Sequence, residues 1–247
     1  MPPISFTNVY LYQLYWVGTL FLQVSSQILL ILASWQMTNA DAAGDRCYLV
    51  YVFSNAPFVV LTFASAYLCR VLGYRSTHLF GQIILVVSVV VLFLYTSHST
   101  VLLALAAITL WHAGIAIRGP SYHATISLLF DGAAKDTAFA WHTIAVNLSK
   151  IFGPMIAAWI ALHAVGASWL LFMGVSIAIS IFAILFLDKT NERAAHKVSD
   201  FVVDRGFLVS LTVVFLISTA LVCNRSLLPS LIRQPGKSHC IRHGRLH

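Results

Sequence analysis

The sequence predicts an all-α polytopic membrane protein, with six transmembrane helices in one bundle followed by a seventh. Three observations lead to this fold class. Of the 247 residues, 59% are hydrophobic and only 9% are charged, whereas a soluble domain carries about 25% charged residues. The mean hydropathy is +0.85. The apolar residues also gather into stretches of roughly 20 residues, the length of helix that crosses the hydrocarbon core of a bilayer.

The first three spans are apolar runs that end at polar segments. Residues 15–35 form the first span, and a polar loop, residues 38–46, follows it. Residues 48–69 form the second span and hold no charged side chain. A basic turn, residues 70–78, then leads into the third span, residues 79–96. These runs predict three helices with alternating direction across the membrane.

The fourth and fifth spans are longer than a bilayer requires. Residues 101–130 would form about 45 Å of helix, so we expect this span to tilt, to bend or to protrude into water. Residues 137–165 are almost as long, and a charged turn, residues 131–136, joins the two. Each span holds a Gly-Pro pair, Gly119-Pro120 and Gly153-Pro154. Helix breakers inside a span usually mark a bend beside a substrate path.

The sixth span, residues 168–187, completes a first domain that covers residues 1–187. A charged connector, residues 188–205, follows it. Residues 206–247 hold a seventh span, residues 206–224, and a basic tail, which we interpret as the start of a second bundle that is otherwise missing.

The distribution of Lys and Arg predicts the orientation, because cytoplasmic loops are enriched in these residues. With the N terminus inside, the inner loops up to the connector hold seven such residues and the outer loops hold one. We therefore expect an integral membrane protein with a cytoplasmic N terminus. The inner cations are Arg70, Arg75, Lys135, Lys189, Arg193, Lys197 and Arg205, and the outer one is Arg46.

Several classes of function are excluded by what the sequence lacks. The net charge is +7, but the basic residues are scattered through short loops with no basic stripe, so we predict no nucleic-acid partner. There is no nucleotide-binding loop and no nucleophile paired with a base, which argues against an enzyme. The four cysteines form no CxxC pair, and we expect neither a metal site nor a cofactor.

Two motifs carry a resemblance to a known family. The stretch SAYLCRVLGYRSTHL resembles the loop between helices two and three of the major facilitator superfamily. Ala66, Leu68, Gly73 and Arg75 stand at the positions of that pattern. Arg70 stands where the family has an aspartate, so the basic residues lack their expected acidic partner.

The second motif is NLSKIFGPMIAAW, which resembles the antiporter motif of helix five. Gly153 and Pro154 match that motif, while Ala157 and Ala158 replace its final glycines. The region is most similar to the small-molecule and siderophore exporters of the superfamily. The resemblance implies a twelve-helix transporter made of two six-helix halves, of which this chain supplies the first half and helix seven.

Arg118 and Lys150 are the strongest candidates for function among the residues themselves. A cation inside a bilayer costs roughly 2.5–3.5 kcal/mol on insertion scales, so each should face the bundle or a wet cavity. The alternative for both is that the long side chain reaches the headgroups. All eight acidic residues lie outside the expected spans. The two cations therefore fit either an anionic substrate or carboxylates of the missing half.

Other polar residues are expected to line the same substrate pathway. Thr19, Gln23, Ser26 and Gln27 share one face of the first span, where they could bind substrate or bond to neighbouring helices. Asn55 could instead satisfy the backbone beside Pro57, and the histidines could be packing residues rather than proton carriers. The expected pathway residues are Gln23, Gln27, Asn55, His112, Arg118, His123, Asn147 and Lys150.

The predicted function is secondary active export of a small organic molecule by alternating access, with proton coupling. The partners would be the lipid bilayer, a small substrate, and a second half or a second copy of the chain. The alternative is a truncated half that inserts, or pairs with another subunit, without transporting.

Overall fold

The computed structural model describes residues 6–40, 47–98, 100–163 and 169–186, and all regular structure in these segments is α-helical. Each of the six helices is long and apolar enough to cross a membrane. The all-α, polytopic part of the prediction is thereby confirmed. The expected seventh span, the connector and the basic tail lie outside the described residues. The helices are α1 Phe6–Ala40, α2 Cys47–Leu72, α3 Tyr74–His98, α4 Val101–Leu129, α5 Gly132–His163 and α6 Trp169–Phe186.

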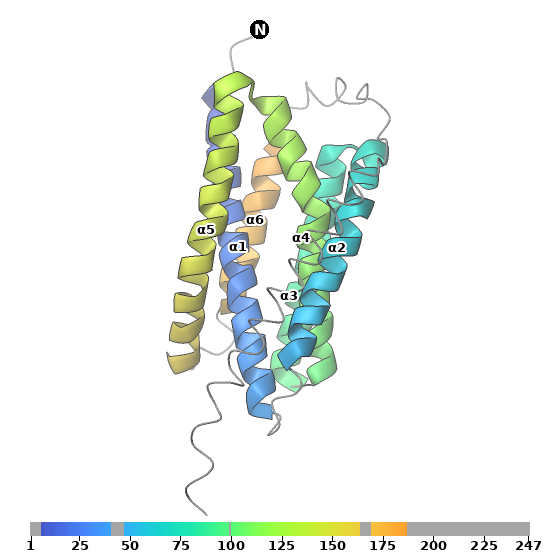
Figure 1. The fold of residues 1–247 in the computed structure, drawn as a ribbon, viewed down its shortest axis with the longest axis vertical. Coiled ribbons are helices and arrows are strands. Elements are labelled where there is room, and N and C mark those ends of the chain that lie inside the picture. The colour runs from blue at the N-terminus through green and yellow to red at the C-terminus, as the bar shows by residue number, and fades with distance from the viewer. Residues whose placement is uncertain (1–5, 41–46, 99, 164–168, 187–247) are drawn as a thin grey trace, which may run out of the picture.

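The helices run alternately up and down the bundle (Figure 1). The start of α1, the α2–α3 turn, the α4–α5 turn and the end of α6 lie at one end of the molecule. This arrangement places Arg70, Arg75 and Lys135, the described cations that the sequence analysis counted as inner, at the same end as the start of α1.

Two sets of three helices make up the bundle. Helix α4 packs mainly against α3 and α2, while α1 packs against α5 and α6, and the α3–α6 contact joins the two sets. In Figure 1, α5, α1, α4 and α2 lie toward the viewer, and α6 and α3 lie behind them. The main apolar core is formed where α1, α3, α4 and α6 meet, with Leu22, Leu85, Ile108, Trp111 and Met173 all fully buried.

Paired glycines bring α3 and α4 close together. A Cβ atom added to Gly114 would lie 2.7 Å from Cγ of Leu85 and 2.8 Å from the carbonyl oxygen of Gly81. A Cβ atom added to Gly81 would in turn lie 2.9 Å from the carbonyl oxygen of Gly114. Small residues at helix crossings allow such close approach in membranes. This contact fixes the segment of α4 that carries Arg118.

Two of the expected turns were placed wrongly. The basic turn expected at residues 70–78 is helical except at Gly73, whose φ of +83° allows α2 to end and α3 to begin within one residue. The charged turn expected at residues 131–136 is similarly short, because α5 already begins at Gly132. Charged side chains suggested loops at both places, but the backbone stays helical because a few charges at a helix end are easily hydrated.

The first helix and the proline-containing helices also differ from expectation. Helix α1 begins at Phe6 and ends at Ala40, so it extends beyond the expected residues 15–35 at both ends. Helices α2, α4 and α5 continue through Pro57, Pro120 and Pro154. Each proline therefore lies inside a continuous helix rather than at a break.

Candidate functional site

The central part of α3 and the whole of α6 expose only apolar side chains to the outside. Along α3 from residue 79 to 95, every exposed residue is Phe, Ile, Val or Leu, and along α6 every exposed residue is Leu, Val, Phe, Ala or Gly. The polar residues His78, Gln82, Ser88, Ser176 and Ser180 of these two helices are fully buried inside the bundle. We call α3 and α6 the apolar layer, and their outer surface is suited to contact with lipid.

The other four helices, which we call the polar layer, carry partly or fully exposed polar side chains along their length. They are α1, α2, α4 and α5, the helices nearest the viewer in Figure 1. All the expected pathway residues lie in this layer, and Arg118 alone among them is buried. The exposed ones are His123, Asn147 and Lys150, and the half-buried ones are Gln23, Gln27, Asn55 and His112.

Arg118 lies inside the bundle, with only 3% of its surface exposed. Its Nη2 donates a hydrogen bond to Oγ1 of Thr19 on α1 over 3.0 Å, while Nη1 has no partner among the described residues. The described acidic residues are Asp131 and Asp136, and both are exposed at the α4–α5 turn. The buried guanidinium thus has no carboxylate partner in the part of the chain that the structure describes.

A buried polar network lies beside Arg118. His78 Nδ1 is 2.8 Å from Oη of Tyr15 and 3.3 Å from Oγ of Ser121. The amide of Gln82 donates to Nε2 of His78 over 3.1 Å and to Oγ of Ser180 over 2.6 Å. With the amide in this orientation, Nδ1 carries the proton of a neutral His78. The network joins α1, α3, α4 and α6 around the arginine.

A second buried tyrosine, Tyr122, packs against Tyr15 in this region. Tyr122 is 1% exposed, its ring centroid is 4.9 Å from that of Tyr15, and its hydroxyl has no partner within the described residues. Gln82 Oε1 is likewise unpartnered there. Buried polar atoms without partners are uncommon. This region therefore keeps hydrogen-bonding capacity that the described helices do not use.

Two histidines meet between α4 and α5, next to Tyr122. The ring centroids of His123 and His142 are 5.0 Å apart with the planes at 86°, and His123 also stacks on Phe139 at 5.7 Å. His142 lies 4.6 Å from the ring of Tyr122. His123 is exposed and His142 is half-buried. The pair thus connects the outside of the polar layer to the tyrosines that surround Arg118.

Lys150 and Asn147 are exposed on α5, and neither makes a hydrogen bond or ion pair with the described residues. Three residues further along, Gly153 is buried against α1, where an added Cβ would collide with Cβ of Gln27. Ala157 is also fully buried, whereas Ala158 is exposed. The segment that resembles the antiporter motif therefore packs α5 onto α1 through Gly153 and Ala157 and leaves Lys150 uncovered.

The polar set expected on one face of α1 divides into two groups. Thr19 and Ser26 point into the bundle, where Thr19 accepts from Arg118 and Ser26 accepts from Nε1 of Trp111 over 2.7 Å. Gln23 and Gln27 are half-buried toward the outside. Two residues on neighbouring helices bond locally: His112 Nδ1 donates to the carbonyl oxygen of Ile108, and Asn55 Nδ2 donates to Oγ of Ser54.

The α2–α3 loop motif forms a hydrogen bond with the C-terminal end of α6. The guanidinium of Arg75 donates to the carbonyl oxygen of Leu185, in the last turn of α6. A cation at the C-terminal end of a helix is favoured by the helix dipole. Gly73 supplies the turn, Arg70 is exposed, and Ala66 and Leu68 are half-buried. The motif thus fixes the end of α6 beside the α2–α3 turn.

Sequence reasoning missed several residues around Arg118. His78 was assigned to a turn, although it lies four residues before Gln82 on α3, a spacing that places both on one helix face. Tyr122 lies four residues after Arg118, a spacing that places both on one face of the fourth span, but it was not among the expected pathway residues. Tyr15 and Ser180 give no signal, because aromatic and serine residues are common in membrane helices. In the described residues, no three His, Cys, Asp or Glu side chains are arranged to hold a metal ion.

Comparison with known proteins adds one finding. A family model described as "transmembrane secretion effector", of the major facilitator type (MFS_3), matches residues 3–240 of the chain. No curated protein and no solved structure matches the chain.

Proposed function

Since the chain belongs to the major facilitator family of transmembrane secretion effectors, we propose that it exports a small organic molecule as a secondary active transporter. The proposed setting is a bacterial inner membrane, with the N terminus in the cytoplasm. Transport would proceed by alternating access, in which the described bundle and a second bundle rock about a central site. A second half of the protein or a second copy of the chain would supply that second bundle.

The observation that carries this proposal is the separation of polar and apolar layers. Polar side chains inside a bilayer are costly unless they face protein or water. In α6 and in residues 79–95 of α3, the glutamine and serine side chains are buried, whereas α1, α4 and α5 keep Gln23, His123, Asn147 and Lys150 partly or fully exposed. A bundle that only packed its own helices would have no reason to leave these groups uncovered. They fit the wall of a substrate pathway that a second bundle closes.

The charge of the polar layer favours an anionic substrate. Lys150 is exposed, and Arg118 lies behind Thr19 with one nitrogen unpartnered. The described spans hold no acid near either cation, because Asp131 and Asp136 lie at the α4–α5 turn. A carboxylate or phosphate group on the substrate would balance this charge, and Lys150 would make the direct contact.

The same layer offers a proton carrier in His123 and His142. An imidazole can take up and release a proton, and this pair contacts Tyr122, with Tyr15, His78 and Arg118 further inside. Protonation of both histidines would place two imidazolium cations about 5 Å apart, with the guanidinium of Arg118 further inside. The pair would therefore hold one proton at a time. That proton would come from water on one side of the membrane and leave to water on the other.

Flux in proteoliposomes tests the pathway. The complete transporter, with its second half or copy, is assayed with a panel of small organic anions under an imposed pH gradient. We expect Lys150→Met to lower flux by roughly tenfold or more, which corresponds to about 1.4 kcal/mol of lost binding. Lys135→Met, which removes the other lysine of α5, serves as the matched control. Equal flux in wild type and Lys150→Met would contradict the assignment.

Proton movement tests the coupling separately. A pH-sensitive dye inside the vesicles records proton release driven by substrate. His123→Gln and His142→Gln are expected to abolish this signal while substrate still moves down its own gradient. His98→Gln, at the exposed end of α3, should leave the signal intact. Proton release that persists in both variants would show that another group carries the proton.

A further inference from the structure

A cavity of about 570 Å³ lies between the first turns of α5, the end of α4 and α1, near the α4–α5 turn. Its volume is within the range of small-molecule sites, roughly 300–1,000 Å³. Four aromatic side chains line it, namely Tyr12, Trp16, Phe130 and Trp141. None of the residues proposed for the substrate pathway lines it.

The aromatic walls are held in place by contacts within the bundle. Tyr12 and Phe130 pack edge to face with centroids 4.7 Å apart, and Trp16 and Trp141 do so at 5.7 Å. Trp16 Nε1 donates to the carbonyl oxygen of Trp141 over 2.8 Å, and Tyr12 Oη donates to that of Ala138 over 3.2 Å. The rings are therefore positioned before any ligand arrives, so binding would not have to order them.

The polarity of the cavity defines its ligand. No charged side chain lines it. The polar atoms of Tyr12, Trp16 and Thr137 are already bonded to backbone carbonyls. Among the lining side chains, the amide of Gln13 and the indole N–H of Trp141 have no hydrogen-bond partner within the described residues, and both residues are exposed. A charged ligand would lose its hydration without compensation here, so the site suits a neutral, largely apolar molecule with few polar groups.

The length of the cavity distinguishes a ring system from an acyl chain. Its lining on α5 runs from Ala134 to Trp141, which is about 10 Å of helix. Two or three fused or linked rings fill such a length, whereas a phospholipid tail spans about 15 Å, half of the roughly 30 Å hydrocarbon core. Aromatic ligands also gain edge-to-face contacts with the ring walls.

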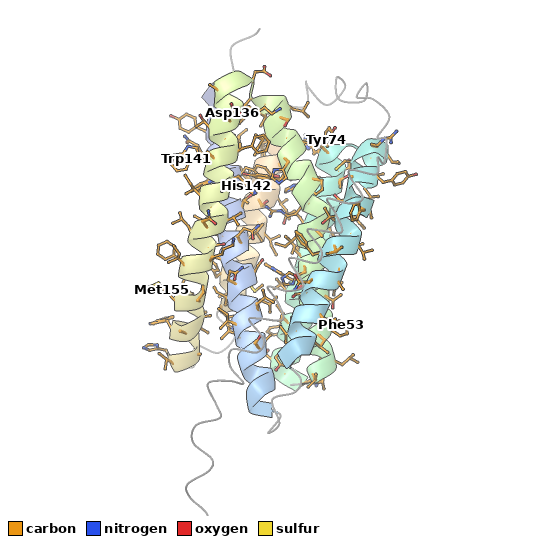
Figure 2. The ribbon with its side chains drawn as sticks, in the orientation of Figure 1. Phe53, Tyr74, Asp136, Trp141, His142 and Met155 are labelled. Atoms are coloured by element: carbon orange, nitrogen blue, oxygen red, sulfur yellow. The ribbon has the colours of Figure 1, made fainter. Side chains whose placement is uncertain are left out.

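Trp141 and His142 lie on different sides of α5. Figure 2 shows His142 directed toward α4 and Trp141 directed away from it. None of the residues that line the cavity belongs to the histidine pair or to the polar network around Arg118, although Tyr12 packs in the same buried cluster as Tyr15 and Tyr122. We propose that the cavity is a second binding site, specific for neutral, flat aromatic molecules that dissolve in the membrane. This proposal does not depend on the proposed function.

The test uses the purified full-length chain in lipid nanodiscs and the neutral fluorophore N-phenyl-1-naphthylamine. Energy transfer from tryptophan to the probe reports binding near Trp16 and Trp141. The wild-type chain is expected to bind the probe saturably. Ala134→Phe fills the cavity from an exposed lining position, and we expect it to raise Kd by roughly tenfold, or about 1.4 kcal/mol.

Ala140→Phe is the matched control. It makes the same change at an exposed alanine on the same helix, outside the cavity lining, so Kd should stay within about twofold of the wild-type value. Equal affinity in the two variants would overturn the proposal. A wild-type signal that rises linearly without saturation would also overturn the proposal. In that case lipid or another segment of the chain occupies the cavity, and the probe only partitions into the bilayer.

Native mass spectrometry distinguishes a lipid occupant. If phospholipid is retained by the wild-type chain and by Ala140→Phe, but lost from Ala134→Phe, the cavity is a lipid site and the assignment to aromatic small molecules is wrong. Displacement of the probe by other neutral aromatic compounds, but not by their anionic derivatives, would support it.

Discussion

Helices α4 and α5 contain similar chemical groups, but the cation and the glycine of each helix lie in opposite environments. Each is about 30 residues long, carries one cation inside the span and contains a Gly-Pro pair. In α4 the cation, Arg118, is buried, while Gly119 has no neighbour within 4 Å of an added Cβ. In α5 the cation, Lys150, is exposed, while Gly153 is pressed against Gln27 of α1.

The difference follows from the positions of the two helices. Helix α4 is surrounded by α2 and α3 and touches α1 and α5, whereas α5 lies at the edge and packs mainly on α1. A central helix turns most of its surface inward, so even its arginine is enclosed and must find partners such as Thr19. An edge helix needs a tight contact on one side only, and Gly153 provides it. The remaining surface of α5, including Lys150, is left for other contacts.

Thiol accessibility should give the largest difference between the two cations. In a chain whose native cysteines are replaced by serine, we expect Lys150→Cys to react with a water-soluble thiol reagent roughly 100-fold faster than Arg118→Cys, because a buried thiol is unreactive. The measurement is the labelling rate in membranes. A cysteine at position 150 that does not react in any state of the complete transporter would refute its place on the pathway.

Gly153→Ala should cost the most stability. The added Cβ would collide with Cβ of Gln27, an atom next to the backbone that cannot rotate away, so α1 and α5 must separate. Overpacking of this kind costs typically 1–3 kcal/mol, and we expect about 3 kcal/mol in the free energy of unfolding, measured in mixed SDS micelles. Unchanged stability would mean that the two helices are further apart than the structure places them.

Thr19→Val should have an intermediate effect. Valine keeps the shape of threonine but removes the hydroxyl that accepts from Arg118 over 3.0 Å. A hydrogen bond to a charged group contributes about 1.5–3 kcal/mol, so we expect a loss of about 2 kcal/mol in the same assay. Thr143→Val, at an exposed threonine of α5, is the control. Equal effects of the two substitutions would show that the bond to Arg118 contributes nothing specific.

Gly119→Ala should have the smallest effect. Like Gly153→Ala, it adds a methyl group to a glycine that precedes a proline. At position 119, however, the added Cβ has no neighbouring atom within 4 Å. Alanine favours a helix over glycine by about 0.5–1 kcal/mol, and the following proline opposes part of this gain. We expect the free energy of unfolding to change by less than about 0.5 kcal/mol. If Gly119→Ala lowered the free energy of unfolding as much as Gly153→Ala, both losses would be caused by the following proline and not by the α1–α5 contact.

Parts of the fold and the candidate site could be predicted from local sequence. Six apolar runs gave six helices, since spanning a bilayer depends on length and polarity within each run. The site was predicted less completely. Arg118 and Lys150 were found because cations are rare in spans, but His78 was assigned to a turn and His142 was not singled out. Their importance comes from neighbours on other helices, Tyr15 for His78 and His123 for His142.

The sequence by itself determined that the chain is a helical membrane protein and which of its residues are unusual inside a span. Both follow from composition along a single segment. Only the tertiary structure decided that Arg118 is enclosed and Lys150 exposed, and that the outer surfaces of α6 and of residues 79–95 of α3 are apolar while the other four helices carry partly or fully exposed polar groups. The burial of a side chain depends on which helices surround its own, and that arrangement is set by contacts between segments far apart in the sequence, such as Gly81 with Gly114.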